Sequence, residues 1–212
     1  MSQSLQIVML VIAYLIGSIP SAVWIGRLFY SVDVREYGSG NAGATNTFRV
    51  LGRRAGIPVL IIDILKGVAA VQLPYLSELL PSSVPFVNLQ LALGVASLFG
   101  HIFPVFAAFK GGKGIATLLG IILAVHPMAA LVSICVFGVV FFATHYVSLS
   151  SITAAIAFPI VVIVVFKTQI PSLVIFSMFI AVLVLITHQK NIERLIKREE
   201  AKTRLNKGRH TK

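Results

Sequence analysis

Residues 115–146 read IATLLGIILAVHPMAALVSICVFGVVFFATHY and contain no Asp, Glu, Lys or Arg. A bilayer core requires about 20 apolar residues per helix, and Pro ends or kinks a helix. The run is therefore expected to break at His126-Pro127 into segments 115–125 and 128–146. These are either two short spans or one span with a re-entrant piece. Such a stretch predicts a chain that passes through a membrane.

The composition of the whole chain agrees with a membrane location. Of its 212 residues, 57% are hydrophobic and 12% charged, at a mean hydropathy of +0.93. An ordinary soluble domain is about 25% charged, and a globule of this length could not hide so much apolar surface. A water-soluble enzyme and a disordered chain are both excluded on this ground. The single cysteine, Cys135, excludes an internal disulfide and a cysteine-cluster metal site.

Seven apolar segments are expected to be helices. They are residues 4–29, 55–76, 87–108, 115–125, 128–146, 151–166 and 171–187. The first has no basic region before it and no Ala-x-Ala site, so it is not interpreted as a cleavable signal. The predicted fold class is an all-α integral membrane protein with seven transmembrane helices, some of them short. Six spans is the alternative count.

Lys and Arg residues in the connecting stretches set the expected orientation. Residues 30–54 contain four, 109–114 two and 188–212 nine, whereas 77–86 and the break at 126–127 contain none. Seven spans place these basic stretches together on the cytoplasmic side, with the N-terminus outside and the C-terminus inside. The chain is expected to be one domain, 1–212, of which 188–212 is a basic cytoplasmic tail. The net charge of +11 then reflects contact with anionic lipids, and nucleic-acid binding is not supported.

The first of three polar stretches, 38–49, contains Gly-x-Gly-x-x-Gly. It is not a dinucleotide fingerprint, because that motif must follow a strand of a parallel sheet. Glycines nevertheless let backbone amides approach an anion closely. The donors that accompany these glycines are Asn41, Thr45, Asn46 and Arg49. The stretch predicts an anion site; the alternative is an interfacial turn with an Arg that obeys the positive-inside rule.

The second polar stretch, 100–117, contains KGGKG at residues 110–114. It is not a Walker A motif, because Gly114 stands where that motif requires Ser or Thr. Two ammonium groups beside a flexible backbone at a helix start predict a second anion site, whereas the alternative is a positive-inside hairpin. His101 lies close by in sequence, as either a ligand-binding or a packing group.

The third polar stretch begins the tail. His188 and Asn191 share one helical face, and Glu193 follows, although a solvated amphipathic tail is the alternative. The H-x₄-E spacing is near the H-x₄-D box of soluble-type glycerolipid acyltransferases, but the acid differs and we discount it. In the second span, Asp63 and Lys66 are spaced as a structural ion pair, with a functional pair as the alternative. No metal site is expected, since the five His residues are scattered and the carboxylates are few.

Together, the three stretches resemble the motifs of the bacterial membrane glycerol-3-phosphate acyltransferases that use acyl phosphate, the PlsY family. The resemblance covers essentially the whole chain. It implies transfer of an acyl chain from acyl phosphate to the 1-hydroxyl of sn-glycerol 3-phosphate. The products would be 1-acylglycerol 3-phosphate (lysophosphatidate) and phosphate, in the first acylation step of bacterial phospholipid synthesis. It also implies the cytoplasmic (inner) membrane, a site facing the cytoplasm, no cofactor or metal, and no covalent acyl-enzyme.

The resemblance assigns roles to individual residues. The catalytic candidates are Ser39, Arg49, Lys110, His188 and Asn191. The substrate-binding candidates are Gly38, Gly40, Asn41, Gly43, Thr45, Asn46, His101, Gly111, Gly112, Lys113, Gly114, Ser148, Ser151 and Glu193, the last matching a residue linked to integrity. The partners expected are acyl phosphate, glycerol 3-phosphate, membrane lipids and, as a candidate, the enzyme that makes acyl phosphate. The chain is expected to be a monomer.

Three other functions remain as alternatives. A transporter or channel for an organic phosphate predicts polar groups through the full membrane depth, whereas here they cluster at the expected inner face. A non-enzymatic scaffold would not need three donor-rich loops. A lipid transferase that uses acyl-CoA is excluded by the resemblance alone.

Overall fold

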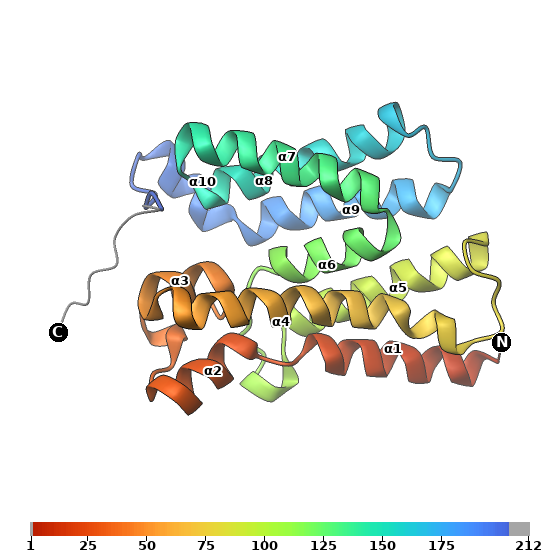
Figure 1. Ribbon diagram of the computed structural model, residues 1–212, viewed down its shortest axis with the longest axis horizontal. Helices are drawn as coiled ribbons and strands as arrows, with labels where there is room; N and C mark the ends of the chain where they lie inside the picture. The colour runs from red at the N-terminus through yellow and green to blue at the C-terminus, as the bar shows by residue number, and fades with distance from the viewer. Residues whose placement is uncertain (1, 204–212) are drawn as a thin grey trace. The chain divides into compact units, whose positions relative to one another are not determined.

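The computed structural model describes residues 2–203, and within this range every regular element is a helix. The chain divides into two compact units, Met1–Pro127 and Met128–Lys212, and each is described by itself (Figure 1). The expectation of a single domain stays a prediction. The basic residues of the tail beyond residue 203 lie outside the described part of the chain.

The first unit contains six α-helices joined by turns and short 3₁₀ helices. They are α1 (Gln3–Gly17), α2 (Ser21–Tyr30), α3 (Ala44–Leu51), α4 (Arg53–Gln72), α5 (Val84–Ile102) and α6 (Ile115–Val125), with 3₁₀ turns η1 (Val34–Glu36), η2 (Leu73–Leu76) and η3 (Val105–Ala107). The first apolar segment thus consists of two helices. Pro20 separates them, because it has no amide hydrogen and disfavours helical backbone in the residue before it. The break leaves the carbonyl of Ile19 available to a side chain from α4.

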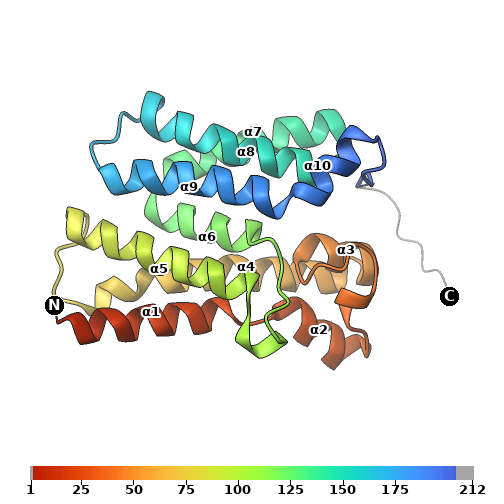
Figure 2. The ribbon, with the colours of Figure 1, turned by 180° about the vertical axis from the view of Figure 1, so that it is seen from behind.

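Glycines let helices of the first unit pack backbone against backbone. A Cβ on Gly67 of α4 would collide with the carbonyl oxygen of Thr117 in α6, and one on Gly120 of α6 with the carbonyl oxygen of Ile64 in α4. Helices α1 and α5 lie side by side in the same manner (Figure 2). Small residues at such contacts are typical of membrane helices. The packing holds the beginning of α6 against α4.

The second unit contains α7 (Pro127–Thr144), α8 (Val147–Ile160), η4 (Val161–Val165), α9 (Pro171–Thr187) and α10 (Gln189–Ile196). Pro159 lies inside α8, and the helix relaxes directly after it into a π-helical turn in which the Phe166 amide donates to the Val161 carbonyl at 3.0 Å. Helices α9 and α10 meet at His188 with a bend of 62°. The bend turns the start of the basic tail away from the axis of α9.

Each of the seven predicted apolar segments is helical, and the break at His126-Pro127 is confirmed as the boundary between α6 and α7. Within residues 2–203, five helical stretches are long and apolar enough to cross a membrane, and α9 with α10 would be a sixth if the bent pair is one span. Helix α6, with 11 residues, is shorter than a span. Large apolar side chains such as Leu28, Leu76 and Phe142 are exposed, as expected of an integral membrane protein. The count of seven spans and the orientation of the termini stay predictions.

Candidate functional site

Asn46 organises the first polar loop from inside. Its side chain is 1% exposed, and its amide group donates to the carbonyls of Val34 at 2.7 Å, Tyr37 at 3.1 Å and Asn41 at 3.1 Å. Its Oδ1 accepts from the amide of Ser39 at 2.8 Å. A buried side chain whose polar atoms are all hydrogen-bonded to backbone groups holds that stretch of backbone in one conformation. The structure therefore places Asn46, expected to bind substrate, as the internal support of the loop.

The loop around this support has a backbone that only glycine adopts easily. Gly38 and Gly40 have φ of +62° and +73°, and a Cβ on Gly38 would collide with Asn46 Oδ1. Gly43 then caps α3, the helix that presents Thr45 and Arg49 on one exposed face four residues apart. The remaining polar candidates of this loop are more accessible than Asn46: Ser39 and Asn41 are half-buried. The first loop thus offers two hydroxyls (Ser39 and Thr45), one amide (Asn41) and one guanidinium (Arg49) to a ligand.

The second loop, residues 110–114, is called the glycine loop below. The amides of Gly111 and Gly112 donate to the carbonyls of Ile102 and His101, both at 3.2 Å. These two amides therefore satisfy the end of α5 and are not available to an anion. Gly114, at φ +80°, begins α6, whose first-turn amides have no partner within the helix. The anion-binding groups of this loop are the first turn of α6 and the two lysines, of which Lys110 is exposed.

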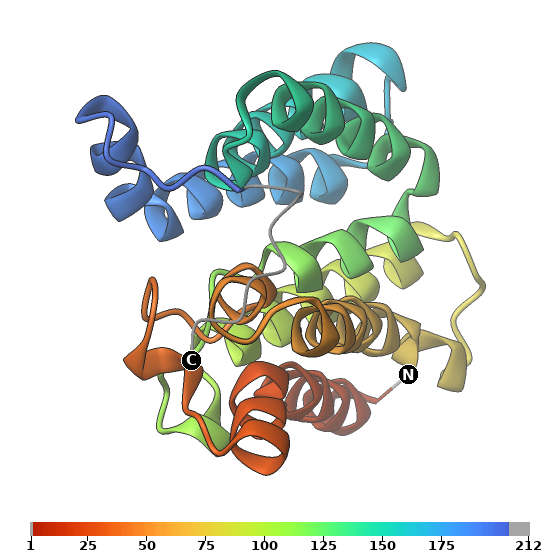
Figure 3. The ribbon, with the colours of Figure 1, turned by 60° about the vertical axis from the view of Figure 1, so that its left-hand side comes forward.

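The two loops are joined in the first unit. The Ala42 amide donates to the Gly111 carbonyl at 3.4 Å, and the Arg35 Nη1 donates to the carbonyls of Ala107 at 2.9 Å and Lys110 at 3.5 Å. Figure 3 shows the two loops side by side at this end of the unit. These contacts show that the first two polar stretches are adjacent, whereas the side of the membrane that they face stays a prediction.

An acid next to Arg35 holds its guanidinium in place. Asp33 accepts from Arg35 at distances of 2.7–3.2 Å and from Arg27 Nη2 at 2.8 Å. The hydrogen bond from Arg35 holds the pKa of the Asp33 carboxyl far below its usual range, and Asp33 in turn raises the pKa of Arg35. The sequence reading treated Arg35 only as a positive-inside residue. Its contacts lie 72 and 75 residues away, so no local pattern reveals them.

A buried ion pair lies beneath the glycine loop. Lys66 Nζ is 2.9 Å from Asp63 Oδ1, which confirms that these two residues form an ion pair. The ring of His101, another predicted substrate-binding residue, is buried between this pair and the loop. Its Nδ1 is 3.1 Å from Thr117 Oγ1. The structure thus places His101 below the loop, in contact with other protein groups.

In the second unit, one carboxylate brings together two predicted site residues and an arginine. Glu200 Oε1 accepts from Ser148 Oγ at 2.7 Å and from Asn191 Nδ2 at 2.6 Å, while Oε2 accepts from Arg194 Nε at 2.8 Å. Burial disfavours the charged form of Glu200, but the hydrogen bonds from Ser148, Asn191 and Arg194 outweigh it and lower its pKa. Glu200 was not among the predicted site residues, although an acid pair at 199–200 in a strongly basic tail was a signal.

The other candidates of this unit lie around that carboxylate or apart from it. His188 is buried at the bend, with Nδ1 2.9 Å from the Val184 carbonyl, and its own carbonyl accepts from the Asn191 amide at 2.8 Å. Ser151 Oγ donates to the Val147 carbonyl within its own helix. Glu193 is exposed and pairs with Lys197 at 2.7 Å, so the structure does not bring it to Ser148 and Asn191.

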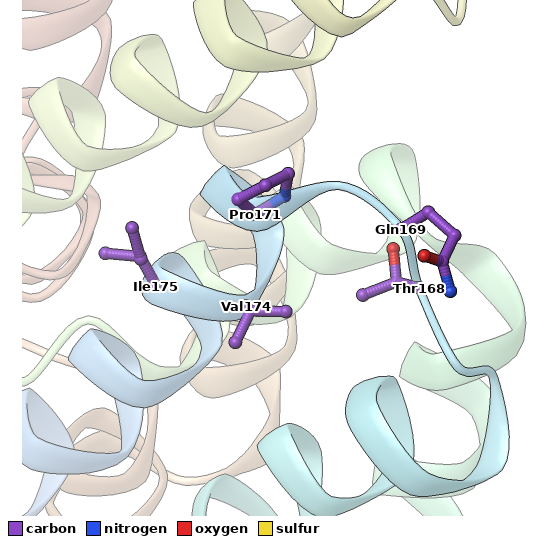
Figure 4. Close-up of a pocket in the computed structure, with 5 residues that line it drawn as sticks. All are labelled: Thr168, Gln169, Pro171, Val174 and Ile175. Carbon is purple, nitrogen blue, oxygen red and sulfur yellow. The ribbon is translucent and has the colours of Figure 1, made fainter.

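The remaining described residues add no candidate site. Across residues 2–203, no group of three or more His, Cys, Asp or Glu side chains is arranged to hold a metal ion. An open hollow with a volume of about 380 Å³ is lined by Thr168, Gln169, Pro171, Val174 and Ile175 (Figure 4). It lies at the start of α9, whereas His188 follows the end of that helix, about 25 Å away at 1.5 Å per residue. No predicted site residue lines it.

The chain is similar along most of its length to proteins of one named activity. Residues 7–198 match the profile of the family described as glycerol-3-phosphate acyltransferase. The chain is 41% identical to the glycerol-3-phosphate acyltransferase of Chlorobium phaeobacteroides (strain BS1), covering 92% of this chain and 94% of the relative. It is 44% identical to that of Enterococcus faecalis (strain ATCC 700802 / V583), covering 89% and 88%. The crystal structure of PlsY, an integral membrane glycerol 3-phosphate acyltransferase, in its glycerol 3-phosphate form, matches with a TM-score of 0.84 at 36% identity, covering 94% of this chain and 96% of that one.

Proposed function

The chain belongs to the glycerol-3-phosphate acyltransferase family of integral membrane enzymes, and we propose that its acyl donor is an acyl phosphate. The acceptor would be the 1-hydroxyl of sn-glycerol 3-phosphate and the products 1-acylglycerol 3-phosphate and phosphate. The proposal places the reaction at the cytoplasmic face of the bacterial inner membrane, where it would begin phospholipid synthesis. Solved PlsY structures described as a glycerol 3-phosphate form and a lysophosphatidic acid form support this acceptor and product.

The observation that carries the proposal is the joining of two cationic, donor-rich loops in the first unit. The Ala42–Gly111 hydrogen bond and the Arg35 contacts attach the loop that presents Ser39 and Arg49 to the loop that presents Lys110. Both substrates carry phosphate, and guanidinium, ammonium and helix amides are the groups that bind phosphate. A pair of such loops suits a reaction with two phosphorylated substrates better than one with a single anion.

The proposed reaction needs positioning and charge stabilisation more than a strong nucleophile. The hydroxyl oxygen of glycerol 3-phosphate attacks the acyl carbonyl carbon, and a new ester C–O bond forms. The C–O bond to phosphate breaks, the phosphate leaves with the electron pair, and it takes up the hydroxyl proton. Arg49 would stabilise the leaving phosphate and the oxyanion, with Ser39 as a hydroxyl donor, and Lys110 of the glycine loop would bind the phosphate of glycerol 3-phosphate. His188 and Asn191 are proposed to be required for turnover, and no metal or cofactor takes part.

The test supplies purified enzyme with glycerol 3-phosphate and one of three donors: palmitoyl phosphate, palmitoyl-CoA or palmitoyl-acyl carrier protein, each with chelator. We expect lysophosphatidate only with palmitoyl phosphate. Turnover with a thioester but not with palmitoyl phosphate would contradict the proposed donor, and silence with all three would favour the transport alternative.

The role of Arg49 is tested by Arg49→Ala, with Arg54→Ala as the matched control. Both arginines are exposed and lie five residues apart, but only Arg49 belongs to the first loop. We expect Arg49→Ala to abolish turnover with normal folded yield and Arg54→Ala to keep it. Loss of folded protein with Arg49→Ala would instead show that Arg49 is structural.

A further inference from the structure

A cluster of charged and polar side chains is buried among the helices of the first unit. Asp63 Oδ1 accepts from Ser21 Oγ at 2.7 Å and from Lys66 Nζ at 2.9 Å, and it lies 3.7 Å from His101 Nδ1. Lys66 also donates to the Ile19 carbonyl at the break between α1 and α2, at 3.0 Å. The Asp63 and Lys66 side chains are 1% and 4% exposed. Charges at this depth are costly, and they usually mark a function.

His101 connects the cluster to the backbone of the glycine loop. The His101 carbonyl accepts from the Gly112 amide at 3.2 Å, and the His101 Nε2 lies 2.5 Å from where a Cβ on Gly112 would be. The other ring nitrogen, Nδ1, is 3.1 Å from Thr117 Oγ1 in the first turn of α6. His101 therefore contacts Gly112, in the middle of the glycine loop, through its backbone and its ring. Its ring also contacts Thr117 in α6, the helix that follows the loop.

Stability alone does not explain this cluster. Among the described residues, the buried side-chain atoms that lack a hydrogen-bond partner are Ser18 Oγ, Asp63 Oδ2 and Ser97 Oγ. Asp63 belongs to the cluster itself, Ser97 lies one turn before His101 on α5, and Ser18 lies at the break whose carbonyl Lys66 binds. A buried ion pair with an unsatisfied oxygen is often less stable than apolar side chains of similar volume. Proteins keep such arrangements chiefly at functional or strained sites.

We propose that Asp63, Lys66 and His101 are positioning residues, which set the backbone of the glycine loop for binding the phosphate of glycerol 3-phosphate. The proposal rests on the proposed function, in which this loop binds the acceptor. Asp63 and Lys66 act through His101, and His101 acts through Gly112. None of the three touches the substrate. The cluster thus determines acceptor affinity from inside the membrane-spanning helices.

The experiment compares Asp63→Asn, the double variant Asp63→Asn/Lys66→Met and wild type. For each, the KM for glycerol 3-phosphate, the KM for palmitoyl phosphate, kcat and the melting temperature are measured. We expect both variants to raise the acceptor KM about tenfold or more and to change the donor KM less than about twofold. The double variant regains the melting temperature lost in Asp63→Asn, because it removes the uncompensated buried lysine, but it does not regain the acceptor KM.

Two control variants separate positioning from packing and from the proposed function. Gln90→Met removes a buried hydrogen bond from α5 to the Val71 carbonyl of α4, about 16 Å along the helix from His101, and should lower stability without raising the acceptor KM. Gly112→Ala places a Cβ against the His101 ring and should raise the acceptor KM.

The outcomes distinguish the two proposals. The positioning role would be overturned by any of three results. They are an acceptor KM of the double variant within about twofold of wild type, a parallel rise of the acceptor and donor KM values, or a rise of the acceptor KM with Gln90→Met. The double variant decides the matter if Asp63→Asn fails to fold. An unchanged acceptor KM in Gly112→Ala would instead overturn the assignment of the glycine loop to the acceptor.

Discussion

Replacing Asn46 by Asp tests whether the first loop is built around this side chain. The change keeps the shape and the Oδ1 that accepts from the Ser39 amide, but removes the donor to three carbonyls at 2.7, 3.1 and 3.1 Å. The NH2 group has two hydrogens, which the three carbonyls share, and each lost hydrogen bond contributes about 1 kcal/mol, so the ordered loop loses about 2 kcal/mol before any repulsion between the carboxylate and the carbonyls. That free energy corresponds to about thirtyfold in the equilibrium between ordered and open loop.

The assay measures kcat/KM for acyl transfer together with hydrogen exchange of the segment 34–46. We expect kcat/KM to fall between about tenfold and a hundredfold, with faster exchange confined to that segment. Ser31→Asp adds the same charge at an exposed position of the same unit and should leave both unchanged. If Asn46→Asp retains kcat/KM and exchange within about twofold of this control, the supporting role of Asn46 is refuted.

Three further predictions follow from single contacts. Gly67→Ala should lower the free energy of unfolding by about 1–3 kcal/mol, because the new Cβ would collide with the backbone of α6. The control Gly138→Ala places its Cβ in open space and should be neutral or slightly stabilising. Equal melting temperatures of the two variants in detergent would contradict this prediction. Arg35→Lys should lower kcat/KM about tenfold through loss of the charged hydrogen bonds to the carbonyls of Ala107 and Lys110, while Arg27→Lys, at a residue 60% exposed, should keep kcat/KM within about twofold of wild type. Equal effects of the two variants would contradict the role given to Arg35. Glu200→Gln should lower the melting temperature at pH 7. Because the folded-state pKa of Glu200 is lowered, this deficit should begin to shrink as the pH falls below the ordinary Glu pKa of about 4.3 and should vanish below the folded-state pKa. A deficit independent of pH would contradict the ionised contact.

The helices could be predicted from the sequence because their signal is local. A long apolar run and a proline suffice to place α6, the boundary at His126-Pro127 and α7, and each other apolar segment is also helical. The π-helical turn after Pro159 and the separation of α1 from α2 were not predicted. Both depend on how the freed carbonyls are satisfied, and for Ile19 the partner is a lysine 47 residues away.

The residue types of the candidate site could be predicted from the sequence, but the hydrogen bonds between its residues could not. The three polar stretches were found because glycines, amides and cations gather in short windows. The different roles of Asn46 and Asn41 were not, since both are loop asparagines in sequence and only folding encloses one of them. Arg35 and Glu200 were missed for a similar reason. Their partners come from other elements, so their importance emerges only in three dimensions.

The most direct test of the proposed reaction is simultaneous measurement of phosphate and lysophosphatidate from palmitoyl phosphate and glycerol 3-phosphate with the purified wild-type enzyme. We expect the two products in equal amounts at every time point, and neither product when glycerol 3-phosphate is left out. Phosphate release without the acceptor, or in excess of lysophosphatidate, would contradict direct acyl transfer and show hydrolysis of the donor instead.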